Sequence, residues 1–184
     1  MTKALIVIDM LEGYMKDTDN SKKIIKNISS LIKTFQQNDL KVILSMPKFG
    51  SKRKNPVMIR LWGEELKGNP DDSKIIKELS CFKYDKIIEK SEYDVFYKTK
   101  FETYCKTNNI DELYFSGVFS GACIFFSAAG AAIRKIQPYL ITDASGGPRR
   151  SLVNKGWQQD TFKRFKLMIG PLISTNKLIE IINK

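Results

Sequence analysis

The stretch Gly117-Val118-Phe119-Ser120-Gly121-Ala122-Cys123 has the character of a turn from a buried strand into a helix. Residues 112–116 before it are mostly apolar and aromatic, which is typical of a strand. The residues after it place alanines and a glycine, 128–132, where a helix would follow. Because small side chains allow a helix to lie close to a sheet, the stretch predicts a strand-turn-helix unit packed in the interior.

Working outward, strands and helices alternate along the chain. Strands are predicted at residues 3–8, 41–46, 86–89, 112–116, 138–142 and 172–173, and helices at 24–35, 74–79, 99–106, directly after 123, at 155–166 and from 175. Residues 48–72 contain prolines and glycines without a long periodic run and predict an irregular surface excursion. The pattern predicts an α/β fold: a Rossmann-like parallel sheet of about six strands with helices on both faces, forming a three-layer sandwich in a single domain, residues 1–184.

The composition narrows the class of protein. With 184 residues and 42% hydrophobic side chains, the chain can form a packed core. It contains no stretch near the ~20 apolar residues that span a bilayer and no signal-peptide pattern, so we expect a soluble, cytoplasmic protein without a membrane partner. Three widely spaced cysteines predict free thiols, and the absence of histidine and of a paired-cysteine motif predicts no metal site and no cofactor.

The net charge of +11 raises nucleic-acid binding as an alternative function. The lysines and arginines are spread over the whole length, however, which is typical of solvated surfaces. We therefore expect no nucleic-acid partner, and a gel shift at low salt would test this.

Three polar residues arrive at the carboxyl edge of the predicted sheet, where open parallel sheets bind ligands. Asp9 closes the first strand, Lys90 follows the third, and Cys123 lies in the first turn of the helix after the fourth. Taken singly, Cys123 could be a small buried hydrophobe, Asp9 a loop cap and Lys90 a solvated lysine. A helix N-terminus and a nearby cation would favour the thiolate of Cys123, and Asp9 could act as its base.

Several segments together resemble the isochorismatase-like cysteine hydrolases. Residues 4–10 are similar to the family's strand ending V-I-D-M, residues 90–99 to K-x-x-Y-S-x-F-x-x-T, residues 117–123 to G-V-x-T-x-x-C, and 143–144 to its D-A pair. Trp62-Gly63 falls where many members have W-G. The resemblance spans residues 3–145, and the order and spacing of three motifs make it more specific than any one motif alone.

The resemblance implies roles for particular residues. Asp9, Lys90 and Cys123 take the catalytic triad positions, and a cis peptide is expected between Val118 and Phe119, pointing the backbone N–H groups of Phe119 and Cys123 at one oxyanion. Substrate-binding positions are predicted for the aromatic residues Tyr14, Trp62, Tyr93 and Phe119, each equally compatible with ordinary core, and for Ser120, which replaces the usual threonine. The family also implies a homo-oligomer.

The implied activity is hydrolysis of a C–N bond in a small amide or carbamoyl substrate through a thioester, since Cys123 is retained. Departures leave alternatives open. Residues 11–14 differ from the Q-N-D-F that is usual in the family, so substrate contacts of this loop are in doubt. The sequence also lacks the histidine-containing metal site of nicotinamidases. A catalytically inactive member serving binding or assembly, and a member that cleaves a vinyl ether, are the competing hypotheses.

Overall fold

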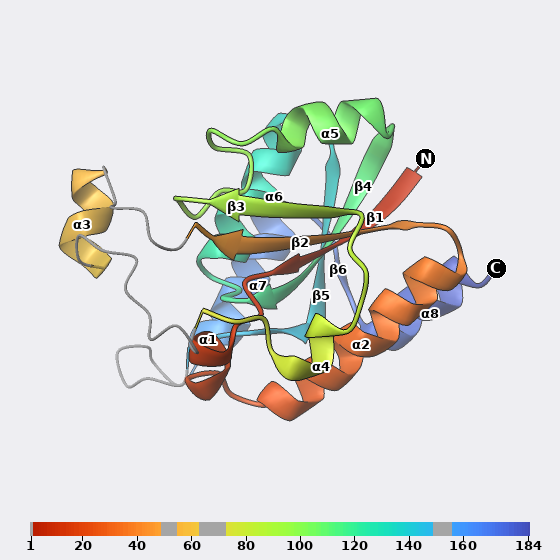
Figure 1. Ribbon diagram of the computed structural model, residues 1–184, viewed down its shortest axis with the longest axis horizontal. Helices are drawn as coiled ribbons and strands as arrows, with labels where there is room; N and C mark the ends of the chain where they lie inside the picture. Colours follow the sequence, from red (N-terminus) through yellow and green to blue (C-terminus); the bar gives the residue numbers. More distant parts are fainter. Residues whose placement is uncertain (1, 49–54, 63–72, 149–155) are drawn as a thin grey trace.

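The structure, a computed structural model, describes residues 2–48, 55–62, 73–148 and 156–184. Six strands and their connecting helices follow one another along the chain (Figure 1). In order they are β1 (Thr2–Ile8), α1 (Glu12–Lys16), α2 (Ser21–Gln37), β2 (Lys41–Pro47), α3 (Pro56–Trp62), α4 (Lys77–Ser80), β3 (Lys86–Lys90), α5 (Phe101–Thr107), β4 (Ile110–Val118), α6 (Cys123–Ile133), β5 (Gln137–Gly146), α7 (Trp157–Met168), β6 (Leu172–Ile173) and α8 (Thr175–Ile182).

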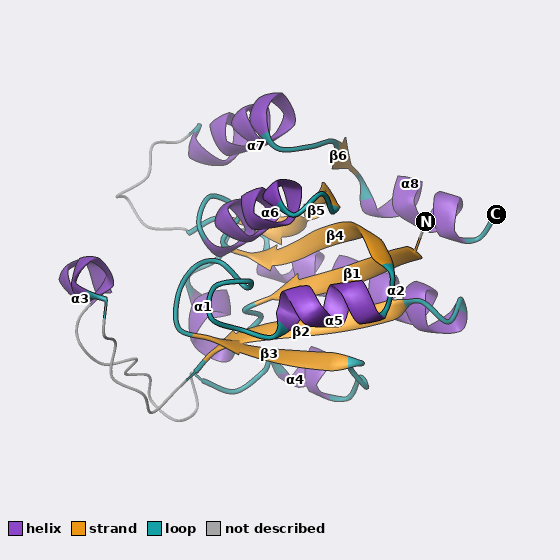
Figure 2. Cartoon of the chain, turned by 90° about the horizontal axis from the view of Figure 1, so that it is seen from above, coloured by secondary structure: helices purple, strands orange, loops and turns teal. Residues whose placement is uncertain are grey.

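The strands form one sheet in the order β3-β2-β1-β4-β5-β6, and every neighbouring pair is parallel. Seen from above, the sheet lies between layers of helices (Figure 2). The predicted α/β class, the parallel sheet of six strands and the helical layers are therefore confirmed. No helix among the described residues is long and apolar enough to cross a membrane.

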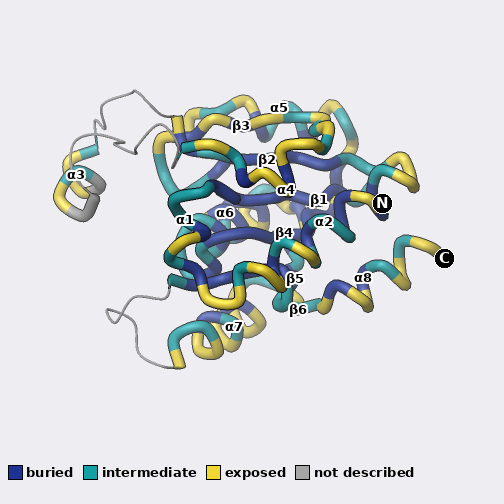
Figure 3. The backbone as a smooth tube through the Cα atoms, turned by 60° about the horizontal axis from the view of Figure 1, so that its bottom comes forward, coloured by how far each residue is buried: buried dark blue, intermediate teal, exposed yellow. Residues whose placement is uncertain are grey.

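Two hydrophobic cores lie on opposite faces of the sheet because strand side chains alternate in direction. On β1, Ala4, Ile6 and Ile8 face the core under α5, α6 and α7, whereas Leu5 and Val7 face the core under α2, α4 and α8. Both sets are fully buried, which explains why the strand reads as a continuous apolar run. Strands β1, β2 and β4 form the buried centre of the molecule, whereas the edge strand β3 is partly exposed (Figure 3).

Helix α2 shows how the pattern produces the packing. Its buried apolar residues recur at intervals of three and four, the spacing of one face of a helix: Ile24, Ile28, Leu31, Ile32 and Phe35. This face covers the sheet and also contacts α8. The amphipathic helix predicted at 24–35 is thus present and begins three residues earlier.

Some elements differ from the prediction. The excursion at 48–72 was expected to be irregular throughout, but Pro56–Trp62 forms the helix α3. A proline at the first helical position is compatible with a helix start, and a helix this short gives only two turns of periodicity. Helix α1 was also missed. Strand β5 runs to Gly146, four residues further than predicted, and Lys90 is the last residue of β3 instead of following it.

Candidate active site

The sheet order identifies one place at which the chain leaves neighbouring strands toward opposite faces. From β1 the chain proceeds to α2 on one face, and from β4 it proceeds to α6 on the other. The carboxyl ends of two such strands leave a crevice in which open α/β sheets bind ligands. Asp9 follows β1 directly and residues 119–123 follow β4, so both lie at this switch point.

Asp9 is fully buried and held through its backbone and its side chain. Its φ of +52° is in the left-handed region, which aspartate tolerates better than most residues. The Asp9 backbone N–H donates to the Ser45 carbonyl oxygen at 3.0 Å, and Asp9 Oδ1 accepts a hydrogen bond from Ser45 Oγ at 3.0 Å. The carboxylate therefore has one oxygen committed to β2.

Gly117 makes the close approach of β4 to β1 possible. Its φ is +104°, and a Cβ at this position would overlap the backbone carbonyl oxygen of Ile8, the residue that precedes Asp9. Only glycine meets both conditions. The glycine in the motif is thus explained by the approach of two backbones beside the candidate site.

Lys90 contacts both Asp9 and Cys123. Its Nζ lies 2.7 Å from Asp9 Oδ2, and it donates to Cys123 Sγ and to the Glu92 carbonyl oxygen, both at 3.3 Å. These partners match the three donors of an ammonium group. Burial alone would lower the pKa of Lys90, but the charge of Asp9 and the contact with Cys123 overcome this and raise it. Lys90 is therefore a charged, 4% exposed lysine and not a solvated one.

Cys123 is the first residue of α6 and is half-buried. Burial raises the pKa of its thiol to about 12; the Lys90 charge lowers it in part, and the Asp9 charge raises it again. The Lys90 cation acts in the direction expected from the sequence, because it lowers the pKa, but burial acts against it and is the largest effect. The loss of solvent therefore favours the protonated thiol, from which a base must remove the proton.

The other cysteines lie elsewhere. Cys105 is buried in the core under α5, where burial raises its pKa to about 12, and Cys81 is exposed after α4. Neither has Asp9 or Lys90 as a partner in any contact that the structure records. Of the three thiols, Cys123 is the one that meets an ion pair.

The turn before Cys123 has the expected backbone arrangement. The Val118–Phe119 peptide is cis. The N–H of Ser120 donates to the Gly146 carbonyl at 2.7 Å, and that of Ala122 donates to the Phe119 carbonyl at 3.0 Å, so both are already used. The N–H of Cys123, at the start of a helix, belongs to the first turn, which has no preceding helical acceptor. Its role with the Phe119 N–H as an oxyanion site remains a prediction.

The predicted substrate-binding residues lie in different surroundings. The Tyr14 ring on α1 contacts the Phe119 ring at 5.7 Å between centroids, beside the turn that leads to Cys123. Tyr93 instead stacks on Phe126 at 5.3 Å. Ser120 is fully buried, and its hydroxyl has no hydrogen bond within the described part of the chain. Trp62 ends α3, and its side chain lies outside the described residues.

Sequence reasoning missed two serines at the site. One is Ser45, which holds Asp9. The other is Ser127, one helical turn after Cys123, which accepts from the Val95 N–H at 3.1 Å and donates to the Tyr93 carbonyl at 3.2 Å. Ser127 therefore ties the loop after Lys90 to the helix that carries Cys123. In both cases the sequence shows only a serine within an otherwise apolar segment.

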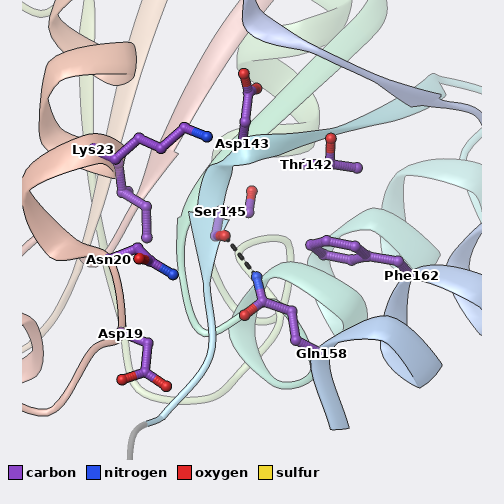
Figure 4. A pocket seen from close by; sticks show the side chains of 9 residues that line it. Asp19, Asn20, Lys23, Thr142, Asp143, Ser145, Gln158 and Phe162 are labelled. Atoms are coloured by element: carbon purple, nitrogen blue, oxygen red, sulfur yellow. Dashed lines mark hydrogen bonds between the residues drawn. The ribbon is translucent and has the colours of Figure 1, made fainter. Parts of the chain in front are cut away.

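A separate pocket of about 470 Å³ lies where β5, the start of α2 and α7 meet (Figure 4). Gln158 Nε2 crosses toward β5 and donates to the Ser145 carbonyl at 2.9 Å. The pocket is lined by Asp19, Asn20, Lys23, Ile24, Thr142, Asp143, Ser145, Gln158 and Phe162. None of the predicted site residues is in this lining, so the pocket is distinct from the Asp9, Lys90 and Cys123 cluster.

Within residues 2–48, 55–62, 73–148 and 156–184, no group of three or more histidines, cysteines, aspartates and glutamates is placed to hold a metal ion.

Comparison with known proteins agrees with the fold and the motifs. Enterobactin synthase component B of Escherichia coli is 24% identical over 146 residues, which cover 77% of this chain and 51% of that protein, so the chain spans about half the length of that relative. A cysteine hydrolase from Pseudomonas syringae superposes with a TM-score of 0.86 at 18% identity, covering 98% of this chain and 92% of the other. N-carbamoylsarcosine amidase from Thermoplasma acidophilum gives 0.80 at 24% identity, covering 96% and 98%.

The sequence profile of the isochorismatase domain matches residues 3–177, which is nearly the whole chain. The match contains the carboxyl ends of β1, β3 and β4 and all three residues of the buried cluster. The resemblance predicted from the motifs is confirmed, and this chain belongs to the isochorismatase family of hydrolases.

Proposed function

We propose that this protein hydrolyses a C–N bond of a small amide or carbamoyl compound, with Cys123 as nucleophile, Asp9 as general base and Lys90 as the cation between them. One observation carries the proposal: the Lys90 ammonium contacts Asp9 Oδ2 at 2.7 Å and Cys123 Sγ at 3.3 Å in a buried setting. A core gains nothing from such a pair, because burying an ion pair costs about as much as the pair returns.

The first step follows from the protonation state at rest. Because the Cys123 thiol holds its proton, Asp9 must accept that proton as the sulfur attacks the substrate carbonyl carbon. A C–S bond forms, and the carbonyl oxygen becomes an oxyanion. Lys90 keeps its charge throughout and lowers the energy of the sulfur anion as it develops.

The backbone completes the reaction. The N–H groups of Phe119 and Cys123 are the proposed donors to the oxyanion. When the tetrahedral intermediate collapses, the C–N bond breaks and the leaving amine or ammonia takes the proton that Asp9 received. Water then attacks the thioester, Asp9 accepts a proton from it, and that proton returns to sulfur as the acid product leaves.

The aromatic pair of Tyr14 and Phe119 supports a substrate with a flat or apolar portion. Their rings contact each other next to the turn that carries the nucleophile, and an aromatic face binds planar groups well. We propose both as substrate contacts. Tyr93 is a weaker candidate for a substrate contact, because its ring is already stacked on Phe126.

A second candidate is cleavage of a vinyl ether, the alternative reaction implied by the resemblance to the isochorismatase-like family. That reaction has no need of a cysteine. The third candidate, a non-catalytic binding protein, does not account for a charged lysine that is 4% exposed beside a thiol.

The three candidates separate in one experiment. Wild type and Cys123→Ala are tested against N-carbamoylsarcosine, nicotinamide, simple aliphatic amides and isochorismate, with ammonia or pyruvate release as the signal. Cys81→Ala is the matched control, because it removes an exposed thiol for which no contact with Asp9 or Lys90 is recorded. We expect release of ammonia that Cys123→Ala abolishes and Cys81→Ala preserves. Ammonia release that survives Cys123→Ala would refute the nucleophile.

We further propose that the protein acts as a cytoplasmic homo-oligomer on small molecules and does not bind nucleic acid. Helix α6 supports self-association, because Phe126 is 49% exposed and Ile133 is 81% exposed on its outer side. Light scattering after size exclusion would give the subunit number. A monomer at micromolar concentration would contradict the proposal.

A further inference from the structure

A serine in the middle of the sheet carries the inference. Ser45 is fully buried on β2, directly after Leu44, which faces the core. A buried hydroxyl without a partner costs about 1–3 kcal/mol. Ser45 Oγ meets this need by donating to Asp9 Oδ1 at 3.0 Å. The hydroxyl is thus directed at the carboxylate of the proposed general base.

The backbone holds the two residues in register. Ser45 pairs with Ile8 of β1, and the next N–H along that strand, that of Asp9, donates to the Ser45 carbonyl at 3.0 Å. Asp9 then turns out of the strand with a positive φ. The same serine therefore fixes the main chain and the side chain of Asp9.

The two carboxylate oxygens have different partners. Oδ1 accepts from Ser45, and Oδ2 lies 2.7 Å from the Lys90 ammonium, which in turn lies 3.3 Å from the sulfur. A carboxylate that could rotate about its Cβ–Cγ bond would exchange these roles. Because Oδ1 is bound to Ser45 and Oδ2 to Lys90, rotation of the Asp9 carboxylate would break both contacts.

We infer that Ser45 is a positioning residue that occupies Asp9 Oδ1 so that Oδ2 is the oxygen that receives the thiol proton. The inference rests on the proposed function of Asp9 as general base. Ser45 touches neither sulfur nor substrate and acts through Asp9. Its hydrogen bond also stabilises the ionised carboxylate, the form that can accept a proton.

The kinetic experiment uses Ser45→Ala, with Ser116→Ala as matched control. Ser116 is an equally buried serine on β4 whose hydroxyl donates to the Ile6 carbonyl at 3.2 Å. With the substrate found in the panel, Ser45→Ala is expected to lower kcat up to about 100-fold with little change in KM, because the base is misplaced.

The control variant distinguishes positioning from a general loss of structure. Ser116→Ala also removes a buried serine hydroxyl, but one that bonds the Ile6 carbonyl and not Asp9, so it should leave kcat near the wild-type value. A kcat that falls no further in Ser45→Ala than in Ser116→Ala overturns the inference.

Two further variants keep the test sharp if Ser45→Ala does not fold. Threonine and valine have nearly the same shape and differ in the hydroxyl, so Ser45→Thr should keep a kcat near that of wild type and Ser45→Val should lower kcat as Ser45→Ala does. A crystal structure of the valine or alanine variant gives a reading without substrate: the Asp9 carboxylate should rotate and its Oδ2 should leave the ammonium of Lys90. An unmoved carboxylate refutes the positioning role, whereas activity of Cys123→Ala refutes only the proposed reaction.

Discussion

Breaking the buried ion pair should cost the protein a large part of its stability. The Lys90 and Asp9 side chains are 3% and 1% exposed, and their charged atoms are 2.7 Å apart. Removing one partner of such a pair leaves an uncompensated buried charge and typically costs about 3–5 kcal/mol. For a domain of this size, about 2–4 °C of melting temperature is lost per kcal/mol, so Lys90→Met should melt roughly 6–20 °C below wild type.

The reciprocal and the double variants isolate the pair. Asp9→Asn is the suitable partner change, because asparagine also tolerates the positive φ of this position. Lys90→Met combined with Asp9→Asn removes both charges, and the double variant should lose less stability than the sum of the singles. We expect an interaction energy of about 2–3 kcal/mol from urea unfolding of the four proteins.

The choice of pH follows from the direction of the pKa shift. The folded-state pKa of Lys90 is raised, so its contribution to stability is complete below its ordinary value of 10.5 and is lost only as the pH rises through the folded-state value. Unfolding at pH 7 therefore records the whole effect. Single variants that each cost under about 1 kcal/mol and add without interaction would show that the pair behaves like an exposed salt bridge and would refute this reasoning.

Three other predictions concern the thiol, the loop and the glycine. Because burial raises the pKa of Cys123 to about 12, iodoacetamide should alkylate Cys123 in the free protein much more slowly than the exposed Cys81 at pH 7–8. The rate of alkylation of Cys123, measured by mass spectrometry, should keep rising with pH up to about 12. A rate that reaches a plateau below pH 9 would contradict this prediction. Ser127→Ala should lower stability by about 1–3 kcal/mol in urea unfolding, because it removes the partner of a buried N–H, and should reduce kcat by loosening the loop that follows Lys90. Gly117→Ala should yield little soluble protein, since the added Cβ meets the backbone of Ile8, and a circular dichroism melt like that of wild type would disprove it.

The sheet and the triad positions could be predicted from the sequence for different physical reasons. Strands buried on both faces are continuous apolar runs, so β1 and β4 were recognisable, and α2 was recognisable by its 3.6-residue period. Asp9 and Cys123 follow strands whose ends meet. Lys90 had no such signal, because a lysine at the end of a strand is usually solvated; the motif resemblance alone pointed to it.

What the sequence did not reveal depends on long-range contacts. Helices α1 and α3 are too short for a period to be distinctive. Ser45 was read as one residue of a strand, because only the parallel register places it beside Asp9, which lies far from it along the chain. The effect of burial on the Cys123 thiol could not be predicted for the same reason: a helix N-terminus is a local feature, whereas burial depends on the whole fold.

The sheet order also explains why a lysine is suited to join the acid and the thiol. Strand β3 is separated from β1 by β2, and strands lie about 4.8 Å apart, so a cation on β3 must reach across about 10 Å to the end of β1. The four-carbon side chain of lysine covers most of that distance, and Asp9 covers the remainder because its turn out of β1 brings the carboxylate toward β2. A shorter basic residue at position 90 would leave the buried carboxylate without its counter-charge. Lys90 on the edge strand β3, Ser45 on β2 and the left-handed turn at Asp9 thus hold the ion pair in place, and the Cys123 sulfur at the start of α6 joins it through Lys90.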